Sequence, residues 1–356
     1  MPPSSHSLSM RFSVRLLASI LLGLLLGTSL SSHSLRAQPE DLSVTAVTLT
    51  VDDLDRAVPF YRDVLSFTPV DTLTARGPEV SRLLGVFGVR GRVVQLRLGR
   101  ETIRLLEVRT PRGRPIPPDS RSNDLWFQHV AIVVRDLPAA FERLRRHDVP
   151  LISAGPQTLP ESIPAAAGIS AVYFRDPTGN PLELIHYPPD KGRSRWHRDA
   201  DSLVLGIDHT ALAVADTERS LAFYRDQLGF RVAGGSVNVG PEQERLTGVF
   251  GARVRITALR PPNGGIGIEL LEYQSPSTGR PFPRDTKTHD LWHAHVHLRT
   301  AQPEETTNAL LDANTPFVSP GLVSLPSSGL GPARAAMIRD PTGHALLLSS
   351  PSTDLP

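Results

Sequence analysis

The sequence predicts an α+β fold of four modules, each a strand, a helix and then strands, paired into two cupped half-barrel mixed sheets. Three observations support this prediction. Residues 206–230 change from the two-residue period of a strand to the period of a helix. The two halves of the chain repeat one another, and each half contains a weaker repeat of the same plan.

The stretch 206–230 shows the plan most clearly. Polar or small residues alternate with apolar ones from His209 onward, as in a half-buried strand. Asp216 is placed to cap a helix, whose apolar positions include Leu221 and Tyr224, and Gly229 ends it. We therefore expect a strand that runs directly into an amphipathic helix, with a histidine near the start of the strand.

The tandem duplication has a nearly constant offset. Residues 44–61 align with 207–224, and GPEVSRLLGVFG at 77–88 aligns with GPEQERLTGVFG at 240–251, both at an offset of 163. A later match, NDLW at 123–126 with HDLW at 289–292, has an offset of 166, and the RDPTG motif at 175–179 recurs at 339–343, an offset of 164. A three-residue insertion therefore separates the two copies.

The repeats divide the chain into four modules. Module 1 covers 43–110, module 2 covers 124–188, module 3 covers 205–274 and module 4 covers 290–351. The first two make a domain at 43–188 and the last two a domain at 205–351, joined by a polar linker at 189–204.

The first 37 residues predict a signal peptide. Arg11 and Arg15 precede an apolar run from Leu16 to Leu26, and small residues around Ala37 suit a cleavage point. We expect an exported protein, periplasmic or secreted, without stable membrane insertion after cleavage. An uncleaved membrane anchor is the alternative, although the run is short for a membrane span.

Composition excludes several classes of function. The chain has 38 basic and 36 acidic residues, and no basic block is interleaved with aromatic residues, so we expect no nucleic-acid partner. The absence of cysteine excludes thiol catalysis, thiolate metal sites and disulfides. A small-molecule substrate is the expected partner, and a chain that pairs its own modules is expected to be a monomer.

In this plan, metal ligands are expected at two fixed positions of each module, an inward residue early in the first strand and another on the last strand. Module 2 has His129 and Glu183, and module 3 has His209 and Glu269. The other modules are depleted, with Ala46 and Arg104 in module 1 and His295 and Leu347 in module 4.

This pattern resembles the vicinal oxygen chelate superfamily, which includes glyoxalases, bleomycin-resistance proteins and extradiol dioxygenases. The resemblance covers residues 43–351 and depends on His209 with DTERSLAFYRDQLGF, the IELLEY strand at 268–273, His129, and RDPTGNPLELIHY at 175–187. It implies one divalent metal, Zn, Ni, Mn, Co or Fe, held by side chains that face into the cup.

The distribution of ligands favours pairing module 2 with module 3 and module 1 with module 4. One cup then contains His129, Glu183, His209 and Glu269, and the other is a degenerate pseudo-site. Pairing 1 with 2 and 3 with 4 is the alternative.

Each candidate ligand also has a purely structural interpretation. His129 and His209 are each as compatible with an interior histidine as with a ligand. Glu269 and Glu272 lie three apart on one strand and face opposite ways, and we choose Glu269 because it is in register with Glu183. His293, His295 and His297 share one sheet face, as a weak metal patch or as the lining of the pseudo-site.

The ligand set implies, by resemblance, a lyase or isomerase of the glyoxalase or methylmalonyl-CoA epimerase type, with Glu183 or Glu269 as catalytic base. One alternative is an extradiol-type dioxygenase with His209, His295 and Glu269 around the metal. The other is a non-catalytic protein that binds a small molecule.

Overall fold

The computed structural model describes residues 39–198, 201–325 and 334–351. The predicted signal peptide at 1–37 lies outside these residues. Among them, no helix is both long and apolar enough to cross a membrane.

All four modules follow the predicted plan. Module 1 contains β1 (Ser43–Val51), α1 (Leu54–Pro59), the π-helical turn η1 (Phe60–Val64), β2 (Thr68–Arg76), α2 (Pro78–Leu84), β3 (Arg90–Leu98) and β4 (Glu101–Thr110). Module 2 contains β5 (Phe127–Val134), α3 (Leu137–Arg146), β6 (Gln157–Thr158), β7 (Ser170–Arg175) and β8 (Pro181–His186). Module 3 contains β9 (Val204–Ala213), α4 (Thr217–Tyr224), β10 (Arg231–Val239), α5 (Pro241–Thr247), β11 (Arg253–Arg260) and β12 (Gly267–Ser275). Module 4 contains β13 (Ala294–Arg299), α6 (Pro303–Asp312), β14 (Val323–Ser324), β15 (Arg334–Arg339) and β16 (Ala345–Ser349).

The helix after the first strand begins at an aspartate in three modules. The carboxylate of Asp53, Asp136 or Asp216 accepts a hydrogen bond from a backbone N–H in the first turn of its helix. The short helices α2 and α5, which begin at the GPE motifs, are not predicted from the sequence, because seven residues are too few to show a helical period.

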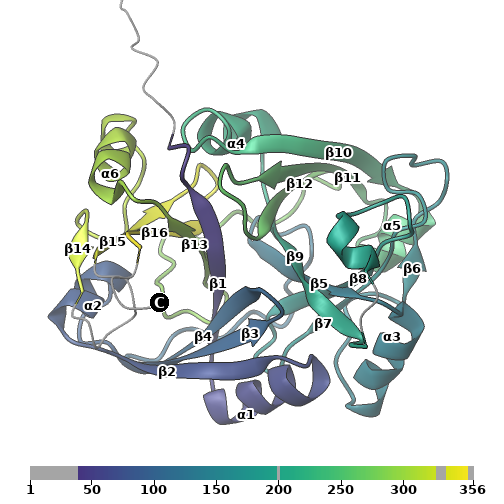
Figure 1. Cartoon of the computed structure of the whole chain (residues 1–356), viewed down its shortest axis with the longest axis horizontal. Helices are drawn as coiled ribbons and strands as arrows, with labels where there is room; N and C mark the ends of the chain where they lie inside the picture. Colours follow the sequence, from purple (N-terminus) through teal and green to yellow (C-terminus); the bar gives the residue numbers. More distant parts are fainter. Residues whose placement is uncertain (1–38, 199–200, 326–333, 352–356) are drawn as a thin grey trace, which may run out of the picture. The chain divides into compact units, whose positions relative to one another are not determined.

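The strands form two eight-stranded mixed sheets, labelled in Figure 1. Sheet A has the order β14-β15-β16-β13-β1-β4-β3-β2, and sheet B has the order β10-β11-β12-β9-β5-β8-β7-β6. Module 1 therefore pairs with module 4, and module 2 with module 3, through the antiparallel contacts of β1 with β13 and of β5 with β9. The pairing that the ligand distribution favoured is confirmed.

The main apolar core includes residues of all four modules, among them Tyr61, Leu137, Tyr224 and Leu310 from the helical segments. The cup of sheet A is filled by a separate apolar cluster that includes Val93, Met337 and Leu347. Two smaller clusters line the cup of sheet B. The polar site described below lies in that second cup.

Residues 193–196, within the segment 189–204 that was expected to be a linker, contact both sheets. The segment contains the 3-10 helix η2 (Ser194–His197), whose Trp196 is buried in an apolar cluster of sheet B. Arg193 makes an ion pair with Asp208 of β9 in sheet B, and Arg195 makes one with Glu101 of β4 in sheet A. These contacts connect the segment to both sheets.

Candidate metal centre

The two histidines of the predicted site lie on the strands that join modules 2 and 3. In the β5–β9 ladder, His129 lies opposite Ala211 and Ala131 lies opposite His209, so the two imidazoles are diagonal neighbours on one face. Their Nε2 atoms are 3.4 Å apart, and both side chains are buried. The repeat thus brings together residues that are 80 positions apart in the chain.

Two glutamates complete the group from the flanking strands. Glu183 on β8 places Oε2 3.0 Å from His129 Nε2 and 3.6 Å from His209 Nε2. Glu269 on β12 places Oε2 3.3 Å from His209 Nε2. The Glu183 side chain is 5% exposed and that of Glu269 is 22% exposed, so Glu269 is the more accessible carboxylate.

Glu272 faces away from this group. Its carboxylate accepts hydrogen bonds from the hydroxyl and the backbone N–H of Thr217 at the start of α4. The strand register that favoured Glu269 over Glu272 therefore agrees with the positions of the two side chains.

Each histidine is oriented through its other ring nitrogen by the residue that precedes it in the chain. His129 Nδ1 contacts Gln128 Oε1, and His209 Nδ1 lies 3.1 Å from Asp208 Oδ2. When Nδ1–H donates to these oxygens, each Nε2 keeps a lone pair directed at the centre of the group. This is the arrangement in which protein histidines bind metals.

Besides His209, four donors hold Asp208, and one of them is the Tyr187 hydroxyl at 3.3 Å from Oδ2. Arg193 Nε, Arg260 Nη2 and Trp196 Nε1 each lie 2.9 Å from its carboxylate. Burial raises its pKa, but the hydrogen bond to His209 and the nearby charges outweigh burial and lower the pKa of Asp208 well below its ordinary value. Asp208 therefore remains a charged acceptor for His209.

The carboxylates around His209 raise its pKa, whereas the surroundings of Asp208 lower that of Asp208. Burial lowers its pKa, but the negative charge of Glu269, the hydrogen bond to Asp208 and the charges of Asp208 and Glu183 together raise the pKa of His209 to about 9. The site therefore favours positive charge between its carboxylates.

The side chains fit a divalent cation. One ligand atom from each of His129, Glu183 and His209 lies within 4.8 Å of the others, the geometry of a metal-binding group. Glu183 Oε2 is buried and has no aligned hydrogen-bond donor, although it lies close to His129 Nε2. A carboxylate oxygen and an imidazole lone pair that face each other repel, and a cation between them removes that repulsion.

The equivalent positions of sheet A lack this set. Ala46, Arg104, His295 and Leu347 lie at the four corresponding positions of β1, β4, β13 and β16. Arg104 thus places a cationic side chain where the other cup has a carboxylate. A small cavity of about 20 Å³ there is lined by Arg104, Thr48, His295, His297 and apolar residues.

The three histidines of module 4 lie together, as their spacing predicted. His293 Nε2 is 3.1 Å from His295 Nδ1, and His297 Nε2 is 2.7 Å from Thr48 Oγ1. Burial is the main cause that lowers the pKa of each of the three. All three are neutral buried side chains, and His295 and His297 line the cavity of the pseudo-site.

The ligand set of the dioxygenase alternative is not assembled. His209 and Glu269 lie in sheet B, but His295 lies in sheet A, because modules 3 and 4 pair with different partners. That alternative assumed that modules 3 and 4 share a cup, and this assumption is wrong.

Three residues near the ligands were missed from the sequence. Gln128 and Asp208 directly precede the histidines, but alternation along a strand predicts that they face the other way. Tyr173 lies opposite Glu183 in the β7–β8 ladder, and its ring centre is 4.8 Å from that of His129. Only the strand register identifies it.

Comparison with known proteins agrees with this geometry. The family model of the Glyoxalase/Bleomycin resistance protein/Dioxygenase superfamily matches residues 43–184 and 206–348. The chain belongs to this superfamily. Both matches fall on the duplicated halves, so the superfamily's plan occurs twice in the chain.

Similar members of the superfamily are enzymes. A 2-epi-5-epi-valiolone epimerase from Actinomyces sp. is 36% identical over 157 residues, which cover 43% of this chain and 84% of that protein. A catechol-2,3-dioxygenase from Bacillus subtilis is 25% identical over 225 residues, 55% of this chain and 67% of that protein. Glyoxalase I from Zea mays shares the fold, with a TM-score of 0.55 at 15% identity over 87% of this chain and 92% of that chain.

Proposed function

We infer that the cup of sheet B holds one divalent metal and that the protein is an isomerase of the epimerase type, acting on a small carbonyl compound. The observation that carries this inference is the convergence of both Nε2 atoms on Glu183 Oε2, with Glu269 beside His209. The similarity to an epimerase over 84% of that protein supports the same reaction class.

His129, Glu183, His209 and Glu269 are the residues that would hold the metal. A bound divalent metal would supply Lewis acidity, which makes a hydrogen on the carbon next to a carbonyl more acidic. Glu183 is enclosed between the two histidines, so its role would be to hold the metal. Glu269 is more exposed and contacts only one histidine, so it has the freedom to move toward a substrate.

Glu269 is our candidate for the catalytic base. Its carboxylate takes the proton from the carbon next to the carbonyl. For epimerisation, water on the other face then supplies a proton to the same carbon and Glu269 releases its proton to solvent; for isomerisation, Glu269 returns the proton to the neighbouring carbon. The reaction is then redox-neutral and needs no second reactant. A base within hydrogen-bond reach of the proton contributes about 10²-fold to 10⁴-fold to the rate.

Tyr173 is positioned to assist proton transfer by Glu269. Burial, followed by the charges of Glu183, Tyr273 and Glu269, raises the pKa of Tyr173 well above its ordinary value. Its hydroxyl therefore keeps its proton and can donate a hydrogen bond to an oxygen of the substrate. This group would stabilise negative charge that develops when Glu269 takes the proton.

A dioxygenase of the extradiol type is the second candidate. It is favoured by the similarity to a catechol-2,3-dioxygenase and by the buried set of two histidines and one carboxylate, His129, His209 and Glu183. In that reaction Glu269 would not be needed as a base. The two candidates therefore differ in what removal of the Glu269 carboxylate does.

The deciding experiment compares the parent protein with Glu269→Gln and with the control Glu272→Gln, whose side chain faces the opposite way. Each protein is loaded with Zn, Ni, Mn, Co or Fe(II), and deuterium uptake from D₂O by α-hydroxy ketones is followed by NMR. We expect exchange in the parent and in Glu272→Gln, and a loss of at least about 10²-fold in Glu269→Gln.

The other outcomes separate the alternatives. Oxygen consumption with catechol by the Fe(II)-loaded protein, without deuterium exchange, would establish the dioxygenase. A parent that retains no metal after loading, when compared with a His129→Ala, His209→Ala double variant, would leave a non-catalytic binding protein.

A further inference from the structure

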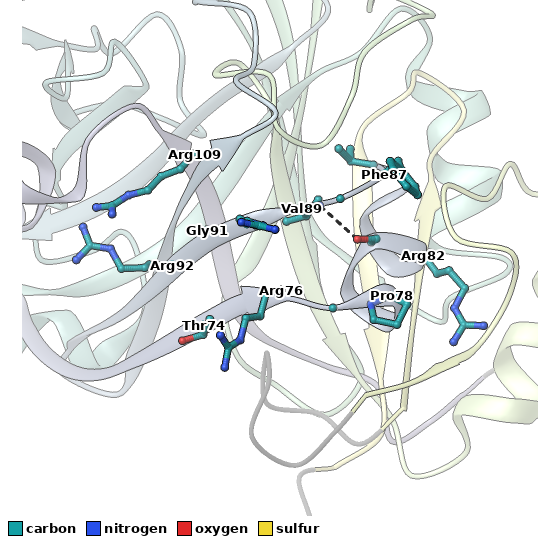
Figure 2. A pocket seen from close by; sticks show the side chains of 15 residues that line it. Thr74, Arg76, Pro78, Arg82, Phe87, Val89, Gly91, Arg92 and Arg109 are labelled. Carbon is teal, nitrogen blue, oxygen red and sulfur yellow. Dashed lines mark hydrogen bonds between the residues drawn. The ribbon is translucent and has the colours of Figure 1, made fainter.

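Module 1 has a hollow of about 1100 Å³ between the end of β2, helix α2 and the start of β3 (Figure 2). Five arginines line it, and no aspartate or glutamate is among the residues that line it. These arginines are Arg76, Arg82, Arg90, Arg92 and Arg109. The hollow therefore has a strongly positive wall.

Neighbouring acidic residues balance only part of this charge. Arg82 pairs with Glu79 at 3.4 Å. Arg92 pairs with Asp55 at 3.4 Å and with Glu107 at 3.3 Å, and Arg109 pairs with Glu107 at 2.9 Å. The side chains of Arg76 and Arg90 form no ion pair or hydrogen bond with any residue that the structure describes. Two guanidinium groups thus face the hollow without a counter-charge.

Arg76 and Arg90 lie directly opposite each other in the β2–β3 ladder. Side chains at opposite positions project from the same face, and like charges there destabilise the sheet. An anion between the two guanidinium groups would reverse this effect. Guanidinium groups match the oxygen atoms of phosphate in paired hydrogen bonds.

Module 3 shows that the hairpin does not require this charge. The corresponding ladder pair there is Val239 opposite Arg253, so one of the two arginines is replaced by valine. Gln274 occupies the position of Arg109 and accepts a hydrogen bond from Arg253 at 3.0 Å. At this ladder position module 3 therefore has one arginine, which is partnered, and the second arginine is particular to module 1.

The hollow also offers an apolar contact. Phe87, in the loop after α2, lines it and is 97% exposed. An exposed aromatic ring beside cationic groups suits a ligand with an apolar or aromatic part next to its anionic group.

We propose that this hollow binds a small molecule that carries a phosphate monoester on an apolar or aromatic group. Arg76 and Arg90 contact the phosphate, and Phe87 packs against the remainder of the ligand. The two unbalanced positive charges match the charge of a phosphate monoester near neutral pH. The site is separate from the candidate metal centre and does not depend on the proposed reaction.

The test uses phenyl phosphate and inorganic phosphate as probes in calorimetric titrations of the full chain. Arg76→Val introduces the residue that module 3 has at this position. Arg253→Val in module 3 removes the same charge elsewhere and is the matched control. We expect phenyl phosphate to bind the parent and Arg253→Val equally, and Arg76→Val at least about tenfold more weakly.

A second variant tests the apolar contact. Phe87→Ala should remove the preference for phenyl phosphate over inorganic phosphate, whereas Phe250→Ala, its counterpart in module 3, should not. Without phosphate, Arg76→Val should melt no lower than the parent, because it relieves the repulsion from Arg90, and this excludes misfolding as the cause of weaker binding.

Three results would overturn the proposal. The first is the absence of phenyl phosphate binding to the parent. The second is an equal loss of affinity in Arg76→Val and Arg253→Val, which would indicate a general effect of net charge. The third is binding that persists in Arg76→Val and is lost in the His129→Ala, His209→Ala variant, which would assign the phosphate to the metal centre.

Discussion

At the residue scale, the candidate metal centre depends on the side chains that hold the histidines as much as on the histidines. Asp208 accepts from His209 Nδ1 and is fixed by Arg193, Arg260 and Trp196. This network sets the orientation of the His209 ring before any ligand arrives. A carboxylate behind a metal-binding imidazole also raises its basicity.

The Asp208→Asn variant should therefore bind metal about 10-fold to 100-fold more weakly than the parent, since loss of such a partner has effects of this size. Affinity is measured by competition with a chelator for Co(II). Glu272→Gln, on the outward face of β12, is the control and should bind as the parent does. Equal affinities of Asp208→Asn and the parent would mean that Asp208 has only a structural role.

The sequence reveals the ligands more readily than their partners. His129 and His209 occupy matching positions of the repeat, so their encounter follows from pairing modules 2 and 3. Gln128 and Asp208 precede them, and alternation along a strand directs neighbouring side chains to opposite faces. Only the structure shows that both side chains reach the adjacent imidazole.

At the element scale, strand β13 and the residue before it place three buried histidines in sheet A. Burial, with a smaller contribution from the charge of Arg104, lowers the pKa of His295 to about 3. An unfolded chain has histidine pKa values near 6.5. Between these values the unfolded state binds a proton that the folded state excludes, so stability decreases as the pH falls.

Replacement of His295 by glutamine should remove one proton-binding side chain from the unfolded state. Between about pH 6 and pH 4, the unfolding free energy of the parent should fall more steeply than that of His295→Gln, by about 1.4 kcal/mol per pH unit. Denaturant titrations at several pH values measure the two slopes. Equal slopes for His295→Gln and the parent would contradict the pKa assignment.

The elements themselves were largely predictable, and the exceptions have physical causes. The strand at 204–213 and the helix capped by Asp216 follow from periodicity and capping. The burial of Trp196 was not predicted, because it is a single large apolar residue in a segment, 189–204, that is otherwise polar. Arg193 and Arg195 form ion pairs with buried carboxylates, and the sequence alone does not show such pairing.

At the scale of the whole molecule, each half of the chain is joined across the two sheets. Tyr61 of module 1 donates to Asp176 of module 2 at 3.0 Å, and Tyr224 of module 3 donates to Asp340 of module 4, also at 3.0 Å. All four residues are buried. Because the modules of each half belong to different sheets, these bonds connect sheet A with sheet B.

Each bond should contribute measurably to stability. Tyr224→Phe should lower the free energy of unfolding by about 1.5–3 kcal/mol, the range for a hydrogen bond to a charged group. Tyr61→Phe should behave alike, and the effects of the two should add in the double variant, since no partner is shared. Chemical denaturation checks this, and a double variant no less stable than either single one would show that the two bonds do not act independently.

The segments that connect the modules also join the two halves of the chain. Arg114 forms an ion pair with Asp290 at 2.7 Å, and Arg280 forms one with Asp124 at 2.5 Å. Trp126 stacks on Trp292, with the ring centres 5.8 Å apart. Each arginine lies after one module and binds the beginning of a module in the other half. The two halves are therefore interlocked at equivalent positions.

The crossed pairing also determines how the polypeptide can be divided. A cut at residues 199–200 would give two fragments, one with His129 and Glu183 and the other with His209 and Glu269. Neither fragment alone has a complete ligand set, and each would expose the open strand edge of β5 or β9. We expect the fragments to be inactive apart and to restore metal binding when coexpressed, so this fold is suited to a split-protein reporter.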